Sequence, residues 1–123
     1  MNICTQVCGI IEVETLCTKD GDKVLEEFIK TLPEVSGDDS SLEYYINQEH
    51  GFNTIEYTKN DGRIESQTVY VVALVGELVG RELLPTIKLL ENVLEGFRQR
   101  FCVKNYAIKA IDESNVHYVE SEV

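Results

Sequence analysis

Four cysteines and two histidines are the residues whose types could bind a metal ion or supply a nucleophile. Zinc sites favour cysteine pairs separated by two to four residues, and Cys4 and Cys8 have this spacing. Both lie in a segment that alternates like a strand, where residues four apart are about 13 Å from each other. That distance is too long for one tetrahedral ion, so we expect no metal site. The other side chains weighed for metal or nucleophile chemistry are Cys17, His50, Cys102 and His117.

The thiols indicate a reducing compartment rather than catalysis. Residues 1–14 lack the basic region and the continuous apolar core of a signal peptide, so we expect a cytoplasmic protein with reduced cysteines. Arg98 and Arg100 lie near Cys102 in sequence, where they could lower the pKa of its thiol. The longest near-apolar run, residues 69–79, is far shorter than the roughly 20 residues that span a bilayer. We therefore expect no cofactor, no catalytic residue and no membrane contact.

Charge gives the clearest functional indication. Asp and Glu total 22 against 11 Lys and Arg, which leaves a net charge of −11. Such a field repels nucleic-acid phosphates and favours positively charged protein partners. Carboxylates on a rigid sheet can occupy a cationic site made for phosphates, as a nucleic-acid mimic or an immunity-type inhibitor would. The candidate acidic surface consists of Asp38, Asp39, Glu120 and Glu122.

A second candidate site is the glycine-bearing junction between an apolar strand and a helix. Gly76, Gly80 and Arg81 lie there, and helix N-termini bind anions through unpaired N–H groups. Glu77 adds a negative charge where a phosphate would bind. The alternative function is therefore a small-molecule or nucleotide-binding protein, or a minor enzyme, that uses residues 76–81.

Hydrophobic periodicity predicts one α+β domain over residues 1–123. The predicted order is β-α-β-β-β-α-β, with residues 116–119 as a candidate extra strand. The last of the three consecutive middle strands is expected to be central in the sheet. It is also expected to be covered on both faces where it ends, because the side chains that point to either face are apolar there. Asn60, Asp61 and Gly62 predict a hairpin turn. The predicted ranges are strands at 3–16, 42–47, 52–58, 64–75 and 103–111, and helices at 20–32 and from about 83 to 101.

Two helices on one face of a mostly antiparallel sheet is the economical packing, and the pattern resembles a ferredoxin-like sandwich. Such a sheet leaves its other face uncovered. Tyr45 and Tyr57 lie on predicted strands, and tyrosine is enriched at interfaces, so we expect self-association. The leading hypothesis is a non-enzymatic, acidic, homo-oligomeric binding protein that blocks a cationic site on a protein partner.

Overall fold

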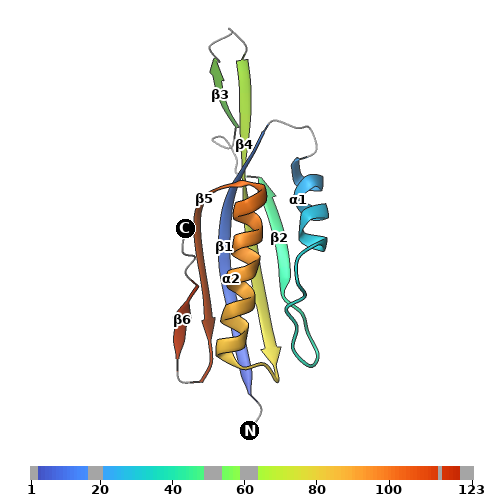
Figure 1. The fold of residues 1–123 in the computed structure, drawn as a ribbon, viewed down its shortest axis with the longest axis vertical. Helices are drawn as coiled ribbons and strands as arrows, with labels where there is room; N and C mark the ends of the chain where they lie inside the picture. The colour runs from blue at the N-terminus through green and yellow to red at the C-terminus, as the bar shows by residue number, and fades with distance from the viewer. Residues whose placement is uncertain (1–2, 17–20, 49–53, 59–63, 114, 120–123) are drawn as a thin grey trace.

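The computed structural model describes residues 3–16, 21–48, 54–58, 64–113 and 115–119. Their elements follow the predicted order, and the added last strand is present (Figure 1). The elements are β1 (Cys4–Leu16), α1 (Gly21–Lys30), β2 (Glu43–Gln48), β3 (Thr54–Thr58), β4 (Ile64–Val79), α2 (Leu83–Arg100), β5 (Cys102–Ile111) and β6 (Val116–Tyr118).

The strands form one antiparallel sheet in the order β2-β4-β1-β5-β6, and β3 pairs with the first part of β4. α2 lies along the sheet and α1 lies beside it, close to β2 (Figure 1). The two helices contact each other through Phe28, whose ring centroid is 4.9 Å from that of Phe97 and 5.1 Å from that of Phe101. This arrangement confirms the α+β class. It matches the ferredoxin-like pattern only loosely, because β3 and β6 extend the sheet.

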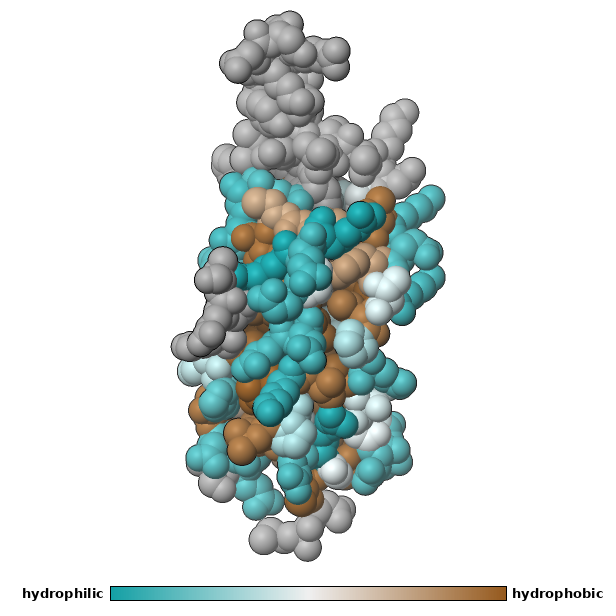
Figure 2. Space-filling model, in the orientation of Figure 1, coloured by the Kyte–Doolittle hydropathy of each residue, from teal (hydrophilic) through white to brown (hydrophobic). Residues whose placement is uncertain are grey.

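Alternation along the strands separates a helix-covered face from an open face. In β1, Val7 and Ile11 are buried beneath the helices, whereas Cys8 and Ile10 are exposed on the other side. The helix-covered side presents a largely hydrophilic surface, with hydrophobic residues showing between the hydrophilic ones at its upper end, middle and lower end (Figure 2). The buried face of α2 consists of Leu83, Thr86, Ile87, Leu90, Val93, Leu94 and Phe97.

Strand β4 differs from the prediction in its length and in its covering. It continues to Val79 because its ladder with β1 continues, so Gly76 is a strand residue opposite Val7. β4 is central, as predicted, but Val75 is 47% exposed. The expectation that the end of this strand is covered on both faces is therefore wrong at Val75.

Two turn regions can be compared with the sequence. α1 ends at Lys30, two residues earlier than expected, because Thr31 and Leu32 donate backbone hydrogen bonds three residues back. The predicted turn at residues 60–62 lies outside the described residues, but the flanking Thr58 and Ile64 pair as a hairpin requires. Within the described ranges, neither helix is long and apolar enough to cross a membrane.

Candidate functional site

The start of β1, the loop between α1 and β2, and the turn between β4 and α2 meet at one end of the molecule (Figure 1). Two backbone hydrogen bonds tie them together. The N–H of Gly80 donates to the carbonyl of Ile3 at 2.6 Å, and the N–H of Asp38 donates to the carbonyl of Val79 at 2.7 Å. Segments far apart in sequence are thereby held in fixed positions around this turn.

The turn between β4 and α2 requires glycine at position 80. Gly80 has φ of 83°, a left-handed conformation that other residues rarely adopt. A Cβ atom there would lie 2.4 Å from the Oδ2 atom of Asp38, so the Asp38 carboxylate occupies the space that glycine leaves. This contact brings one predicted acidic residue and one predicted junction residue into the same site.

Glu82 precedes α2 but does not cap it with its side chain. Its backbone is extended, and its carboxylate makes no capping hydrogen bond. Its carbonyl instead accepts a hydrogen bond of 2.6 Å from the Thr86 hydroxyl. The Glu82 carboxylate is thus exposed beside the first turn of the helix.

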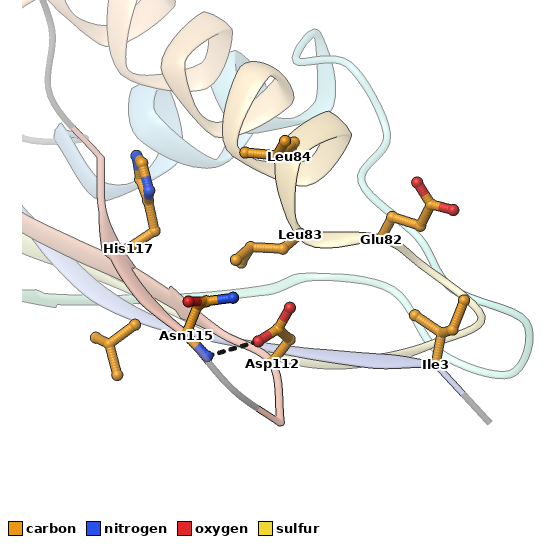
Figure 3. Close-up of a pocket in the computed structure, with 8 residues that line it drawn as sticks. Ile3, Glu82, Leu83, Leu84, Asp112, Asn115 and His117 are labelled. Atoms are coloured by element: carbon orange, nitrogen blue, oxygen red, sulfur yellow. Dashed lines mark hydrogen bonds between the residues drawn. The ribbon is translucent and has the colours of Figure 1, made fainter. Parts of the chain in front are cut away.

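A hollow of about 630 Å³ lies next to this turn, between the start of α2 and the β5–β6 connection (Figure 3). Its polar walls include Glu82, Asp112 and His117, and the Asp112 carboxylate accepts a 2.8 Å hydrogen bond from the backbone N–H of Asn115. Its apolar walls include Leu84, which is 67% exposed. The full lining is Ile3, Glu82, Leu83, Leu84, Asp112, Asn115, Val116 and His117.

The carboxylates of Glu82 and Asp112 line this hollow, and further carboxylates lie on the segments that meet at this end of the molecule. We call this surface the acidic end, and it comprises Asp38, Asp39, Glu77, Glu82, Asp112 and Glu113. Asp112 is half-buried, and the other five residues are exposed. Among the described residues of the converging segments, 3–5, 37–40, 77–84 and 112–117, Arg81 is the one lysine or arginine, and it does not line the hollow. The local field is therefore strongly negative, which suits a cationic group.

The predicted site residues fall into three groups. Asp38, Asp39, Gly80 and Arg81 come together at the acidic end, although the sequence placed them in two separate sites. Gly76 lies within β4 rather than in the turn, because the strand continues past it. Glu120 and Glu122 lie outside the described residues.

The two predicted interface tyrosines lie on different strands. Tyr45 is on β2 and is exposed on the open face of the sheet. The backbone of Tyr57 is in β3, where it pairs with Glu65. The structure therefore does not bring these two residues together in one strand pair.

The site residues predicted from the sequence do not include Glu82 or Asp112. Glu82 could have been noticed as the residue before an apolar helix, whereas for Asp112 the sequence does predict a turn over residues 112–115 and an acidic group there, but not its place beside Glu82. No local signal shows that these two turns meet, because their proximity follows from the packing of β1 between β4 and β5.

Outside the acidic end, the features of the described residues that bear on metal binding and proton transfer are the thiols and the buried Tyr44 phenol. Within the described residues, no three Asp, Glu, His or Cys side chains are grouped to hold a metal ion. Cys4, Cys8 and Cys102 form no disulfide, the Cys4 thiol donates a 4.0 Å hydrogen bond to Glu77, and Cys17 lies outside the described residues. Burial raises the pKa of Tyr44 to about 12, which keeps this phenol neutral.

No protein-family model matches the chain, and no curated protein or solved structure shows significant similarity to it. The geometry of the acidic end is therefore what indicates function. A shallow apolar floor with carboxylates around it can hold a cationic group on an aliphatic stem. Lysine and arginine side chains have this form, with an apolar stem and a charged head.

Proposed function

We propose that the protein is a non-enzymatic binding protein whose acidic end occupies a cationic site on a protein partner, in the manner of an inhibitor or immunity-type protein. The observation that carries this proposal is the apolar hollow bounded by carboxylates from distant chain segments. A partner's lysine or arginine would pack its stem on Leu84 and place its charge between Glu82 and Asp112.

The net charge of −11 supports the same proposal at longer range. An excess of one sign speeds the encounter with a partner of opposite charge, and charges at the rim affect the association rate most. Asp38 and Asp39 are exposed at the rim of the acidic end, where they would contribute to steering. Glu82 and Asp112, which line the hollow, would contribute to holding the bound group.

A small cationic molecule is the second candidate, because the hollow has a volume typical of ligand pockets, which run from about 300 to 1,000 Å³. A nucleotide fits this place less well. Its phosphates would meet the carboxylates of Glu82 and Asp112 beside the helix N-terminus. The small-ligand alternative is therefore best framed as an amine with an apolar body.

The test requires a purified partner, obtained by affinity capture from the native host and identified by mass spectrometry. Association and dissociation rates are then measured at low and high salt for the wild type and two double variants. Asp38→Asn with Asp39→Asn should slow association by on the order of tenfold at low salt, and this difference should shrink at high salt. Glu82→Gln with Asp112→Asn should mainly speed dissociation.

A matched control removes the same charge from another surface. Glu26 and Glu27 are exposed on α1, and their double change to Gln alters net charge as much as either pair at the acidic end. This control should change both rates much less than the other two variants. Rates that are insensitive to salt, or equal effects from all three double variants, would remove the proposal. Saturable binding of small amines that requires Glu82 and Asp112, with no protein partner competing for the hollow, would support the second candidate instead.

A further inference from the structure

The open face of the sheet carries side chains in straight rows across the strands. One central row runs Glu43, Val75, Cys8, Lys109, Tyr118, because each residue pairs with the next in the sheet register. The adjacent row runs Tyr45, Ala73, Ile10, Ala107. The outer rows are Asn47, Val71, Glu12, Asn105 on one side and Glu77, Gln6, Ile111, Val116 on the other.

The two central rows leave an apolar area in contact with solvent. Tyr45 is 52% exposed and Ile10 is 44% exposed, and Val75 lies next to them. Cys8 and Ala107 are exposed as well. The outer rows are more polar, so the face has an apolar centre and a polar rim, as protein interfaces do.

The rows of one copy complement the same rows of a second copy that lies face to face with it. The two copies are related by a two-fold axis that runs between the facing sheets, parallel to the strands and over the gap between β4 and β1. Such a rotation places β2 of one copy over β5 of the other. Glu43 then faces Lys109 of the second copy, at both ends of the same row. Within the described residues Lys109 has no ion-pair partner, so its charge is available for this contact.

The sizes of the facing side chains also match. The same rotation places Tyr45 over Ala107, and the larger Ile10 over Ala73. A hollow of about 310 Å³ lies at this position between β1 and β5, lined in part by Ile10, Ala107 and Tyr118. The Tyr45 ring of one copy would thus enter a hollow on the other copy, which is a knob-and-hole fit.

The area of the face is that of a weak, reversible interface. Each outward residue of a sheet covers about 33 Å², given the strand spacing and the rise per residue. Because β6 of each copy extends past β2 of the other, the residues that face the second copy cover on the order of 450 Å² on each copy, or about 900 Å² in total, which is the range of transient interfaces. A dimer of this size should depend on protein concentration.

We propose that two copies of this chain associate through the open face of the sheet, with Glu43 of each copy paired to Lys109 of the other. The outer row that contains Glu77 and Val116 adjoins the acidic end, but Glu43 and Lys109 belong neither to the acidic end nor to its hollow, so either proposal can fail while the other stands. It requires no partner other than a second copy.

Sedimentation velocity over a wide range of protein concentration tests the proposal. The wild type should shift from monomer to dimer as concentration rises. Glu43→Lys and Lys109→Glu should each lower the association constant by on the order of tenfold or more, because each variant brings like charges together at both ends of the row. Glu26→Lys makes the same change in charge as Glu43→Lys on exposed α1 and should leave association nearly unaffected.

Mixing the two charge variants gives the most specific readout. In a mixed dimer, the lysine introduced at position 43 of one copy faces the glutamate introduced at position 109 of the other. At the opposite end of the row, the unchanged Lys109 of the first copy faces the unchanged Glu43 of the second. Both ion pairs are then restored. Dimer should therefore reappear on mixing, while each variant alone stays largely monomeric.

Three results would overturn the proposal. A wild type that remains monomeric at every concentration excludes the dimer. If both charge variants have the association constant of the wild type, an edge strand or another surface joins the copies. Charge variants that are monomeric alone and also in the mixture would exclude this two-fold arrangement. Circular dichroism of each variant ensures that loss of dimer is not loss of fold.

Discussion

At the scale of single residues, the face of the sheet to which a tyrosine points decides whether it is packed in the core or exposed to solvent. Tyr44 and Tyr45 are adjacent, and the alternation of a strand predicts that they point to opposite faces. The structure places Tyr44 against the core beneath the helices and Tyr45 on the open face, where its hydroxyl donates a 2.5 Å hydrogen bond to Glu43. Two identical residue types therefore have different environments, and this difference was readable from the sequence.

The buried phenol of Tyr44 makes stability depend on alkaline pH. Its pKa is about 12 in the folded protein against an ordinary 10.0, so the unfolded chain releases this proton first as pH rises. The contribution is fully present below pH 10 and is lost between pH 10 and about 12. Between about pH 9 and about pH 11.5, the free energy of unfolding of Tyr44→Phe should fall by about 2 kcal/mol less than that of the wild type. Denaturant titration at the two pH values measures this difference.

Tyr118→Phe is the matched control, because Tyr118 is exposed on β6. Its free energy of unfolding should fall with alkaline pH as the wild type does. If the Tyr44 and Tyr118 variants follow the same pH curve, the Tyr44 phenol is not protected in the folded state.

At the scale of elements, α2 shows how far hydrophobic spacing reaches. Apolar residues at steps of three and four predict the helix, and Leu90, Leu94 and Phe97 are fully buried as expected. Leu84 also lies in the first turn, but on the side of the helix that carries the exposed Lys88, so it is turned away from the sheet and forms a wall of the hollow instead. Periodicity predicts the main apolar face of a helix, but an apolar residue beside that face, such as Leu84, is not thereby covered.

Shortening a side chain at the centre of α2 should be costly. Leu94→Ala is expected to lower the free energy of unfolding by about 2–5 kcal/mol, because it removes apolar contacts and leaves a cavity. Lys88→Ala, at an exposed position of the same helix, should change it by no more than about 0.5 kcal/mol. Denaturant midpoints measure both, and equal midpoints for the two variants would contradict the packing of α2 on the sheet.

The end of β4 shows where prediction from the local sequence fails. Gly76 looks like the beginning of a turn, because glycine is common in turns. The strand nevertheless continues through it, since residues 76–79 pair with residues 4–7 of β1. A pairing partner so distant in sequence leaves no local trace, and this is why the strand expected from the sequence is four residues too short.

At the scale of the whole molecule, the class and order of elements could be predicted, whereas the composition of the acidic end could not. The pattern of strands and helices follows from local periodicity and turn residues. The meeting of Asp38, Glu82 and Asp112 depends on which strands are neighbours, which is a property of the complete sheet. The negative charge of the site was foreseeable because it is a property of the composition.

The folded molecule should be indifferent to chelators and reductants. Cys4, Cys8 and Cys102 are free thiols that form no disulfide, and no grouped metal ligands occur among the described residues. We expect the Tm to be unchanged by either additive, as thermal melts followed by circular dichroism would measure. A large loss of Tm in chelator would reveal a metal site. A large loss in reductant would reveal a disulfide and would also weigh against the reducing compartment that the sequence indicates.

The position of β1 in the middle of the sheet has a consequence for the order in which the chain folds. β1 pairs with β4 and β5, which begin at Ile64 and Cys102. During synthesis β1 emerges before both of its neighbours and waits for them, and its second edge is satisfied only when β5 has been made. Non-local pairing of this kind slows folding, because a long loop must close before any contact rewards it. β1, which is made before β4 and β5, thus completes its hydrogen bonding late.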